Sequence, residues 1–252
     1  MPRWRNRAPA GVAAPRDNLI LGSLSEAAFG RLAPDLVPVD FSQGARFEGD
    51  MVDVHSRFHF VGRGAVSLVY TTADGDSTKL ATIGCEGGVS LGSVLGGSVL
   101  PGERIVQFPG SGWAIDVEVV RREFVRGGSL QRGLLTFGQN LMVQVAQTAV
   151  CNRHHSVELQ FIRWLLLSLD RLTGNDLVMT QEAVAEMLGV RRAGVNEAIG
   201  RLRARGVISV GRGRIRVNDR AALEDWSCQC YRVIRDYYAR HSLQPGTPAA
   251  DP

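Results

Sequence analysis

Short runs of alternating apolar and polar residues fill the chain from about residue 37 to residue 119 and predict β-strands. Strands are expected at 37–41, 58–60, 65–72, 77–83, 105–108 and 113–119. Asp74-Gly75 lies between two of them and predicts a hairpin, because both residues tolerate the positive φ of such turns. A short helix over 18–36, capped at Ser25 and stopped at Pro34, precedes the strands. The regular spacing indicates an antiparallel roll or sandwich.

Helical spacing replaces this alternation after about residue 121. Small and apolar residues recur at spacings of 4, 3, 4, 3 and 4, at Leu134, Gly138, Leu141, Val145, Thr148 and Asn152. Because this is the period of a coiled coil, these residues predict a dimer interface on one long helix. The open alternative is a helix that packs against its own domain. Ser156 can cap a further helix that runs to about Leu172.

The segment from Thr180 to Val217 carries the most specific pattern. Thr180 caps a helix that ends at Gly189, a residue able to take the left-handed conformation of a tight turn, and a second helix follows over about 192–205. This spacing predicts a helix-turn-helix unit. The outward face of the second helix carries only polar or small residues, namely Ala193, Asn196, Glu197 and Gly200. Such a face suits the major groove of DNA, which is about 12 Å wide.

Strands at 207–210 and 214–217, joined by Gly211-Arg-Gly213, predict a β-wing beside this unit. Arg191 and Arg192 can reach guanine or phosphate, Asn196 can pair with adenine, and Glu197 can accept from cytosine. The residues predicted to contact DNA are Thr180, Gln181, Arg191, Arg192, Asn196, Glu197, Arg201, Arg203, Arg212 and Arg214. Arg205 and Arg216 add to the attraction for phosphate. A solvated helical surface with a hairpin beside it is the alternative.

Charge divides along the chain in agreement with this prediction. Residues 17–120 hold six basic and thirteen acidic side chains, whereas residues 121–252 hold nineteen basic and twelve acidic ones. Only the second half is therefore expected to face a polyanion. Residues 1–17 form a predicted mobile basic arm without the apolar segment of a secretory signal, and no apolar run approaches the ~18 residues of a membrane span, so we expect a cytoplasmic protein.

In the long helix, the helix-turn-helix and the wing, the chain resembles the Crp/Fnr family of bacterial transcription regulators. The resemblance is closest at 145–153, 156–158, 180–182 and 185–192. The resemblance implies an α+β fold. Its parts are an N-terminal antiparallel β-roll like the jelly roll of cyclic-nucleotide-binding domains, a long dimerisation helix and a C-terminal winged helix-turn-helix. It also implies homodimers on palindromic double-stranded DNA, a small-molecule effector and contact with RNA polymerase. The expected domains are an arm over 1–17, the roll over 18–128, the dimerisation helix over 129–155, the DNA-binding domain over 156–241 and a tail over 242–252.

Two departures from the family pattern change these expectations. The recognition positions that are commonly Arg, Glu and Arg read Arg192, Ala193 and Glu197 here, so a different half-site is predicted. The candidate effector site is Gly88-Val89 with Arg104, where the family's cyclic-nucleotide binders present Gly-Glu and Arg-Ser or Arg-Thr. Val89 cannot accept a hydrogen bond from ribose, and Ile105 offers phosphate no hydroxyl. We therefore expect an effector other than cyclic AMP.

Other chemistry is weakly indicated. Cys228 and Cys230, read as positions on one helix, would face opposite ways and could not share an ion. His55 and His59 lie too far apart on an extended strand to share one either, so we predict no metal site and no cofactor. Cys85 is a candidate redox thiol.

Residues 88–92 fit the G-x-S-x-G motif of hydrolases around Ser90, but a strand-to-helix context is not expected there, so we predict no catalytic residues and no enzyme. The alternative to a DNA-binding regulator is a roll that binds a small ligand or a partner protein, with incidental DNA affinity.

Overall fold

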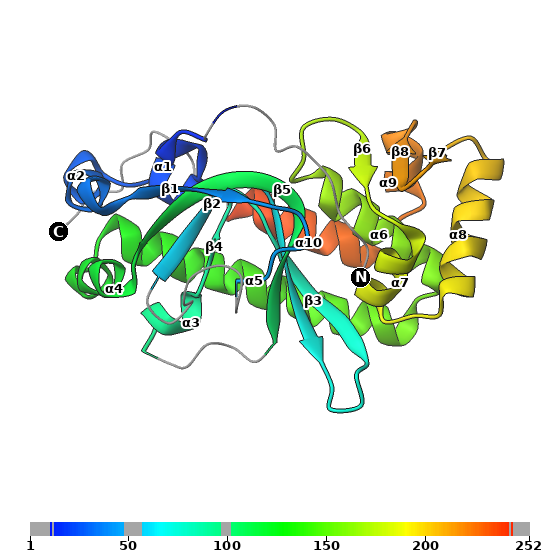
Figure 1. The fold of residues 1–252 in the computed structure, drawn as a ribbon, viewed down its shortest axis with the longest axis horizontal. Helices are drawn as coiled ribbons and strands as arrows, with labels where there is room; N and C mark the ends of the chain where they lie inside the picture. Colours follow the sequence, from blue (N-terminus) through cyan, green and yellow to red (C-terminus); the bar gives the residue numbers. More distant parts are fainter. Residues whose placement is uncertain (1–10, 12, 48–56, 97–101, 242, 244–252) are drawn as a thin grey trace. The chain divides into compact units, whose positions relative to one another are not determined.

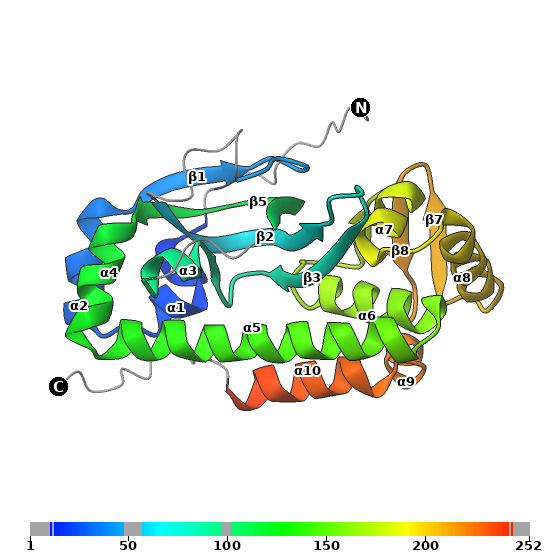
Figure 2. The same ribbon diagram turned by 90° about the horizontal axis from the view of Figure 1, so that it is seen from below.

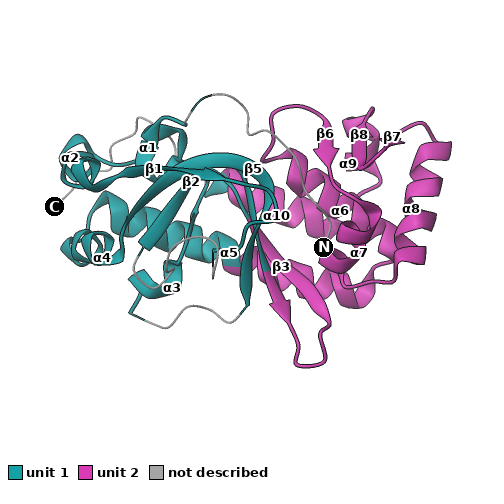
Figure 3. Cartoon of the chain, in the orientation of Figure 1, with its two compact units in different colours: residues 1–68, 83–141, 240–252 teal, residues 69–82, 142–239 magenta. Residues whose placement is uncertain are grey.

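The computed structural model describes residues 11, 13–47, 57–96, 102–241 and 243. The chain folds as two compact units (Figure 3). Unit 1 comprises residues 1–68, 83–141 and 240–252, and unit 2 comprises residues 69–82 and 142–239. Among the described helices, none is long and apolar enough to cross a membrane.

Unit 1 begins with two short helices, α1 (Leu19–Gly22) and α2 (Glu26–Leu32), where the sequence predicts one. The break falls at Ser25, whose hydroxyl caps α2 as expected, and the short 3-10 turn Ala33–Asp35 follows α2. Asn18 caps α1 with its Oδ1 atom and donates both amide hydrogens, to the carbonyl oxygens of Val61 and Gly87, at 2.8 Å each. One buried amide therefore ties α1 to two distant segments of the unit.

A five-stranded sheet follows, shown in Figures 1 and 2. Its strands are β1 (Val37–Phe41), β2 (Arg57–Thr71), β3 (Ser77–Ile83), β4 (Gly88–Val89) and β5 (Glu103–Asp116). The order is β1-β5-β2-β3, with β4 on β2; the β1/β5 and β2/β4 pairs are antiparallel. The N-terminal antiparallel β domain is confirmed, and so is the turn at Asp74-Gly75, where Gly75 has φ of +90°.

Two predicted strand boundaries are wrong. The runs at 58–60 and 65–72 belong to the single strand β2, and the runs at 105–108 and 113–119 belong to β5. β5 ends at Asp116, whose carboxylate accepts from the backbone N–H of Glu118 and starts α4 (Val117–Arg126). Because Asp116 caps a helix, the strand ends three residues before the apolar run at 113–119 does.

The predicted arm over 1–17 is also corrected in part. Residues 1–10 and 12 lie outside the described residues, but Ala13 is fully buried. Its N–H donates to Ser111 Oγ at 3.0 Å, and its carbonyl accepts from Trp113 Nε1 at 2.9 Å. Residues 15–17 form a 3-10 turn. Ala13 is thus anchored on β5, and the 3-10 turn that follows it is ordered, so residues 13–17 are not part of a mobile arm.

A long helix, α5 (Ser129–His154), contributes residues to both units. Unit 2 continues with α6 (Val157–Leu169), β6 (Asp176–Val178), α7 (Gln181–Leu188), α8 (Arg192–Ala204), β7 (Ile208–Gly211), β8 (Arg214–Val217), α9 (Arg220–Asp225) and α10 (Gln229–Arg240). α6 is buried almost all round, with Phe161 stacked on Trp164 in its first two turns. Figure 2 shows α10 lying alongside the second half of α5.

The prediction that Cys228 and Cys230 lie on one helix is wrong. α10 begins at Gln229, after the loop that follows α9, so Cys228 precedes the helix and only Cys230 lies on it. The helical 100° per residue therefore does not separate the two side chains, and their sulfur atoms converge.

Candidate nucleic-acid interface

α7 and α8 form the helix-turn-helix that the sequence predicts. Thr180 caps α7 by accepting from the N–H of Ala183 at 3.2 Å. Gly189 ends α7 with φ of +65°, and the N–H of Val190 closes the turn on the carbonyl of Ala185 at 3.1 Å. A left-handed residue reverses the chain within two positions, so α8 begins at Arg192.

The two faces of α8 differ as the spacing predicts. Val195, Ala198, Ile199 and Leu202 are buried. Ala193, Asn196, Glu197 and Gly200 are exposed. Gly194 lies on the inner side, where an added Cβ would touch Val157 of α6 at 3.4 Å. Since 3.4 Å is an ordinary van der Waals separation, α8 packs against α6 on this side, and the polar face of α8 is the exposed one.

A three-stranded sheet of order β6-β8-β7 forms the wing. β7 and β8 are the two predicted strands, and Gly213 takes φ of +65° in the turn between them. β6 was not predicted; it pairs antiparallel with β8 along Asp176–Val178. Arg212, Arg214 and Arg216 are exposed, and Arg216 lies 4.0 Å from Asp176. The third strand thus supports the wing and partly neutralises its last arginine.

Ion pairs sort the predicted contact residues into two groups. Arg201 pairs with Glu158 and lies 3.7 Å from Glu197, and Arg205 lies 3.4 Å from Glu158 and over the ring of Trp226. Within the described part of the chain, the other predicted arginines make no ion pair, namely Arg191, Arg192, Arg203, Arg212 and Arg214. The unneutralised charge therefore lies at the start of α8, at Arg203 and on the wing. Thr180 and Gln181, the remaining predicted contacts, are half-buried.

The predicted dimer surface of α5 is covered by its own chain. Leu134, Leu141 and Thr148 are at most 6 % exposed, and Gly138, Val145 and Asn152 are half-buried. The exposed apolar side chains lie one or two positions further along: Leu135 is 51 % exposed, Met142 73 % and Val150 42 %. Ala146 and Ala149 are exposed between them. The coiled-coil period is present, but the row open to a partner is the adjacent one.

The predicted effector residues come together in unit 1. Gly88, Val89 and Arg104 line one small pocket with Ser90 and Leu141. The buried Arg104 donates from Nη1 to the carbonyl of Gly102 at 2.6 Å, and burial lowers its pKa. At Gly88 an added Cβ would lie 2.7 Å from the carbonyl oxygen of His59, so close strand packing explains this glycine.

Ser90 corrects one expectation about this segment. It follows β4 with φ of +81° and precedes the short helix α3 (Leu91–Val94), so the strand-to-helix turn that the sequence did not predict is present. Its Oγ atom is buried, and no hydrogen-bond partner lies among the described residues. The sheet around it is antiparallel, unlike the alternating β and α units of hydrolases.

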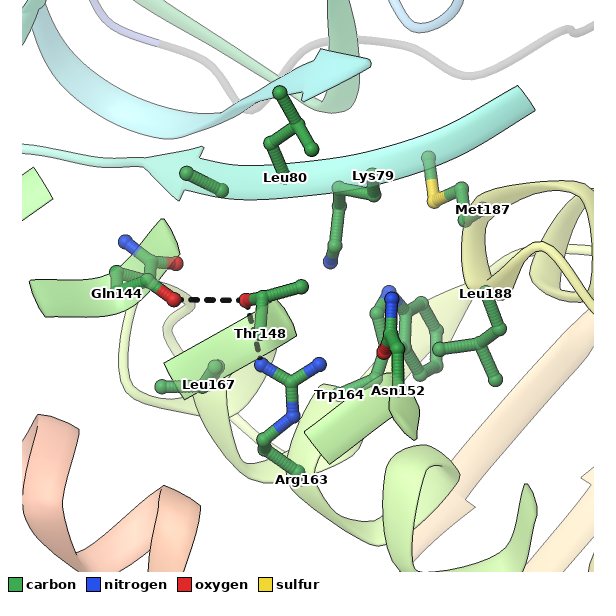
Figure 4. A pocket seen from close by; sticks show the side chains of 11 residues that line it. Lys79, Leu80, Gln144, Thr148, Asn152, Arg163, Trp164, Leu167, Met187 and Leu188 are labelled. Atoms are coloured by element: carbon green, nitrogen blue, oxygen red, sulfur yellow. Dashed lines mark hydrogen bonds between the residues drawn. The ribbon is translucent and has the colours of Figure 1, made fainter. Parts of the chain in front are cut away.

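A second pocket lies within unit 2 (Figure 4). Lys79 of β3 reaches into it, with Nζ 5.6 Å from the ring centre of Trp164, and Arg163 donates to Thr148 Oγ1 at 2.8 Å. Burial, and then the charges of Arg163 and Arg171, hold the pKa of Lys79 well below its usual value.

The remaining cysteines and histidines differ in their placement. His59 is buried in β2, whereas His55 lies outside the described residues. Cys85 is half-buried in unit 1. Cys151, His155, Cys228 and Cys230 bring their sulfur and nitrogen atoms within 4.8 Å of one another in unit 2. The expectation that the two C-terminal cysteines cannot share an ion is therefore wrong on geometric grounds.

Comparison with known proteins identifies the same region. Residues 160–226 match the model of the Crp-like helix-turn-helix domain. None of the curated proteins matches the chain. FixK2 from Bradyrhizobium japonicum has a similar structure, with a TM-score of 0.62 at 15 % identity over 77 % of this chain and 98 % of FixK2.

Two further structures agree. A putative Crp/Fnr-family transcriptional regulator from Eubacterium rectale gives a TM-score of 0.59 at 16 % identity, over 83 % of this chain and 95 % of that one. A CRP-family transcriptional regulator from Thermus thermophilus gives 0.58 at 16 % identity, over 74 % and 95 %. The resemblance read from the sequence is thus confirmed: residues 160–226 are a Crp-like helix-turn-helix domain, in a chain with the fold of Crp/Fnr-family transcription regulators.

Proposed function

We propose that this protein is a homodimeric, sequence-specific transcription regulator that inserts α8 into the major groove of duplex DNA. The observation that carries the proposal is the outward face of α8. Arg192 and Asn196 are exposed there, beside a wing whose Arg212 and Arg214 make no ion pair within the described residues. A polar helix face next to unneutralised arginines supplies both base readout and phosphate attraction.

Each part of the interface has a separate role in this proposal. The first turn of α8 presents Arg191 and Arg192 with the free backbone N–H groups of a helix N-terminus, which favours phosphate and the guanine edge. Asn196 reads adenine and Glu197 accepts from cytosine. Thr180 and Gln181, at the start of α7, and Arg203, Arg212 and Arg214 position the domain on phosphates. Arg201 contributes less, because Glu158 already neutralises it.

The second copy of the chain is proposed to pair through the exposed row of α5, which comprises Leu135, Met142, Ala146, Ala149 and Val150. Side chains at this spacing form a continuous apolar seam along a helix, and a second α5 offers the matching seam. A two-fold dimer presents two recognition helices to half-sites about 34 Å apart, so the operator is expected to be palindromic. Contact with RNA polymerase then gives the regulatory output.

The effector is proposed to bind the pocket of Gly88, Val89 and Arg104 and to be something other than cyclic AMP or cyclic GMP. Arg104 offers one buried cation, but Val89 provides no acceptor for a ribose hydroxyl. Each hydrogen bond that a buried ligand leaves unmade costs about 1–3 kcal/mol. Titration calorimetry with both cyclic nucleotides should show no micromolar binding, and micromolar affinity for either would overturn this part of the proposal.

Selection from a randomised pool of DNA duplexes with the full-length protein tests the main proposal. We expect one palindromic sequence to be enriched and its affinity to fall steeply with salt. Arg192→Ala should weaken this site by about 1–3 kcal/mol and relax the preference at one base pair. Binding without sequence preference would favour the alternative, a ligand-binding or partner-binding roll with incidental DNA affinity. No duplex binding at low ionic strength would overturn the proposal.

A further inference from the structure

Four side chains of metal-ligand type converge in unit 2, away from the α8 surface. Cys151 lies in the last turn of α5, and His155 follows the end of that helix. Cys228 precedes α10, and Cys230 lies in its first turn. Their ligand atoms all lie within 4.8 Å of one another. Cys151 and Cys230 are fully buried, Cys228 is 7 % exposed and His155 is half-buried.

Two of the separations within this cluster match the edges of a metal tetrahedron, and the others are at most 4.8 Å. Cys151 Sγ lies 3.8 Å from Cys228 Sγ, and Cys230 Sγ lies 3.6 Å from His155 Nδ1. Tetrahedral zinc with Zn–S of about 2.3 Å and Zn–N of about 2.0–2.1 Å spaces two sulfurs by about 3.8 Å and a sulfur and a nitrogen by about 3.6 Å. A disulfide would need sulfurs about 2.05 Å apart. The side chains are therefore spaced as the ligands of one ion.

The chemistry of the cluster suits a metal ion. A thiol binds a metal as the thiolate, so a bound ion takes the place of the thiol protons of Cys151, Cys228 and Cys230.

Arg163 gives a second, independent indication. Its side chain is 4 % exposed, its Nε atom has no hydrogen-bond partner, and no carboxylate pairs with it in the described part of the chain. A buried cation without a counter-charge is costly. Three thiolates, one neutral imidazole and a divalent ion carry a net charge of −1, which would supply the missing counter-charge beside Arg163.

We propose that Cys151, His155, Cys228 and Cys230 bind one Zn²⁺ ion, which joins the end of α5 to the start of α10. Three thiolates and an imidazole in tetrahedral array suit zinc among the common metals. All four positions are taken by protein, so the site is structural and has no open position for a substrate. A polynuclear iron–sulfur cluster distributes its cysteines over several irons, which needs a wider spacing than this one.

The site gives the protein a dependence on metal and on reduced thiols that is separate from DNA recognition. α10 contacts α5 beyond the ion as well, through the hydrogen bond from Gln144 Nε2 to the hydroxyl of Tyr238 at 2.9 Å. Loss of zinc should therefore loosen α10 first, at its N-terminal end. Hydrogen exchange in α10 should rise while exchange in β2 and β5 stays unchanged.

The test is metal analysis of the full-length chain purified under reducing conditions without a metal-affinity tag. We expect one zinc per chain, and loading with Co²⁺ should give the intense visible bands of a tetrahedral cobalt thiolate. Cys228→Ser and His155→Gln should bring the zinc content to background. Their matched controls, Cys85→Ser and His154→Gln, change the same residue types outside the cluster and should retain one zinc per chain.

A second measurement covers variants that fail to fold. Titrating the wild-type protein with an organomercurial, in the presence of a chromogenic zinc chelator, should release the zinc in step with blocked thiols. His155→Cys should keep the metal, since four cysteines also form a zinc site. Metal-free protein with four reactive thiols, a Cys151–Cys228 disulfide, bound iron, or zinc retained in Cys228→Ser would each overturn the proposal. None of these outcomes bears on binding of DNA.

Discussion

Glu158, in the first turn of α6, forms ion pairs with Arg201 near the end of α8, 43 positions along the chain. Glu158 is 18 % exposed and Arg201 47 %, and Arg205 shares the same carboxylate. One acidic side chain thus offsets part of the charge of two arginines, on and just after the helix proposed to read DNA. These ion pairs hold α8 against α6, and they also reduce the positive charge that this end of α8 presents to DNA.

Glu158→Gln should release both arginines for phosphate. We expect tighter non-specific DNA binding and a salt dependence steeper by up to about 2 in log K against log salt, since each phosphate contact contributes about 0.9. Stability should fall by less than about 1 kcal/mol, because exposed ion pairs contribute little. Fluorescence anisotropy over a salt series measures the slope. Asp236→Asn makes the same change of charge on α10, and an equal response from it would show that net charge alone is responsible.

Two glycines of the helix-turn-helix should respond oppositely to alanine. At Gly189, φ is +65° and an added Cβ would lie 2.6 Å from Thr78 Oγ1, so Gly189→Ala should destabilise the protein by at least about 1–2 kcal/mol. At Gly200, within α8, an added Cβ meets nothing within 4 Å. Gly200→Ala should stabilise by up to about 1 kcal/mol. Urea unfolding measures both, and a shift in the same direction for the two would contradict this account of the turn.

Acid should weaken the protein through His59. Burial, and then the charge of Arg57, lowers the pKa of His59 from 6.5 to about 4. Between pH 6.5 and pH 4, His59 is protonated in the unfolded chain but stays neutral in the folded chain. The free energy of unfolding should therefore fall by up to about 3 kcal/mol over this range. Above pH 6.5 the contribution of His59 is fully present. His59→Phe should remove this part of the loss.

Urea midpoints at several pH values, for wild type and variant together, measure the His59 contribution. Comparing variants cancels the effects common to both chains, including acid release of a bound metal. His241→Gln, an exposed histidine, serves as control and should follow the wild type. A pH profile of His59→Phe parallel to that of the wild type would refute the assignment.

Neighbouring residues of α5 should separate dimerisation from folding. Met142 is 73 % exposed and Leu141 6 %. Met142→Asp should give a folded monomer, because it places charge in the proposed seam, whereas Leu141→Asp buries an unpaired charge and should unfold the chain. Sedimentation and thermal unfolding distinguish the two results. A Met142→Asp protein that stays dimeric would place the interface elsewhere.

Local patterns predicted the DNA-binding region well. Thr180, Gly189 and the spacing of Val195, Ile199 and Leu202 define α7, the turn and α8, because caps, left-handed glycines and helical periodicity act within a few residues. The wing strands follow from the same kind of local signal. β6 escaped prediction because it is three residues long and depends on pairing with a strand far along the chain.

The proposed dimer surface could not be assigned from the sequence, because α5 carries two adjacent apolar rows. The structure shows that the row of Leu134 and Leu141 is buried within the chain. The row of Leu135 and Met142 is exposed. The cysteine cluster was missed for a different reason. The apolar pattern of this region extends the predicted helix through Cys228, whereas α10 begins at Gln229. The ends of helices are the hardest part of a fold to predict. Whether Cys228 and Cys230 converge depends on where α10 begins.

The amide of Asn18 has a consequence for how the chain can vary. It accepts from two N–H groups of α1 and donates to the carbonyls of Val61 and Gly87, all inside a fully buried site. Aspartate lacks the two donors, leucine lacks every polar atom, and glutamine is one methylene too long. In a library holding every substitution, position 18 should tolerate asparagine alone. Hydrolysis of this amide would replace the donor nitrogen by an oxygen that faces both carbonyls, so deamidation at Asn18 would destabilise the fold.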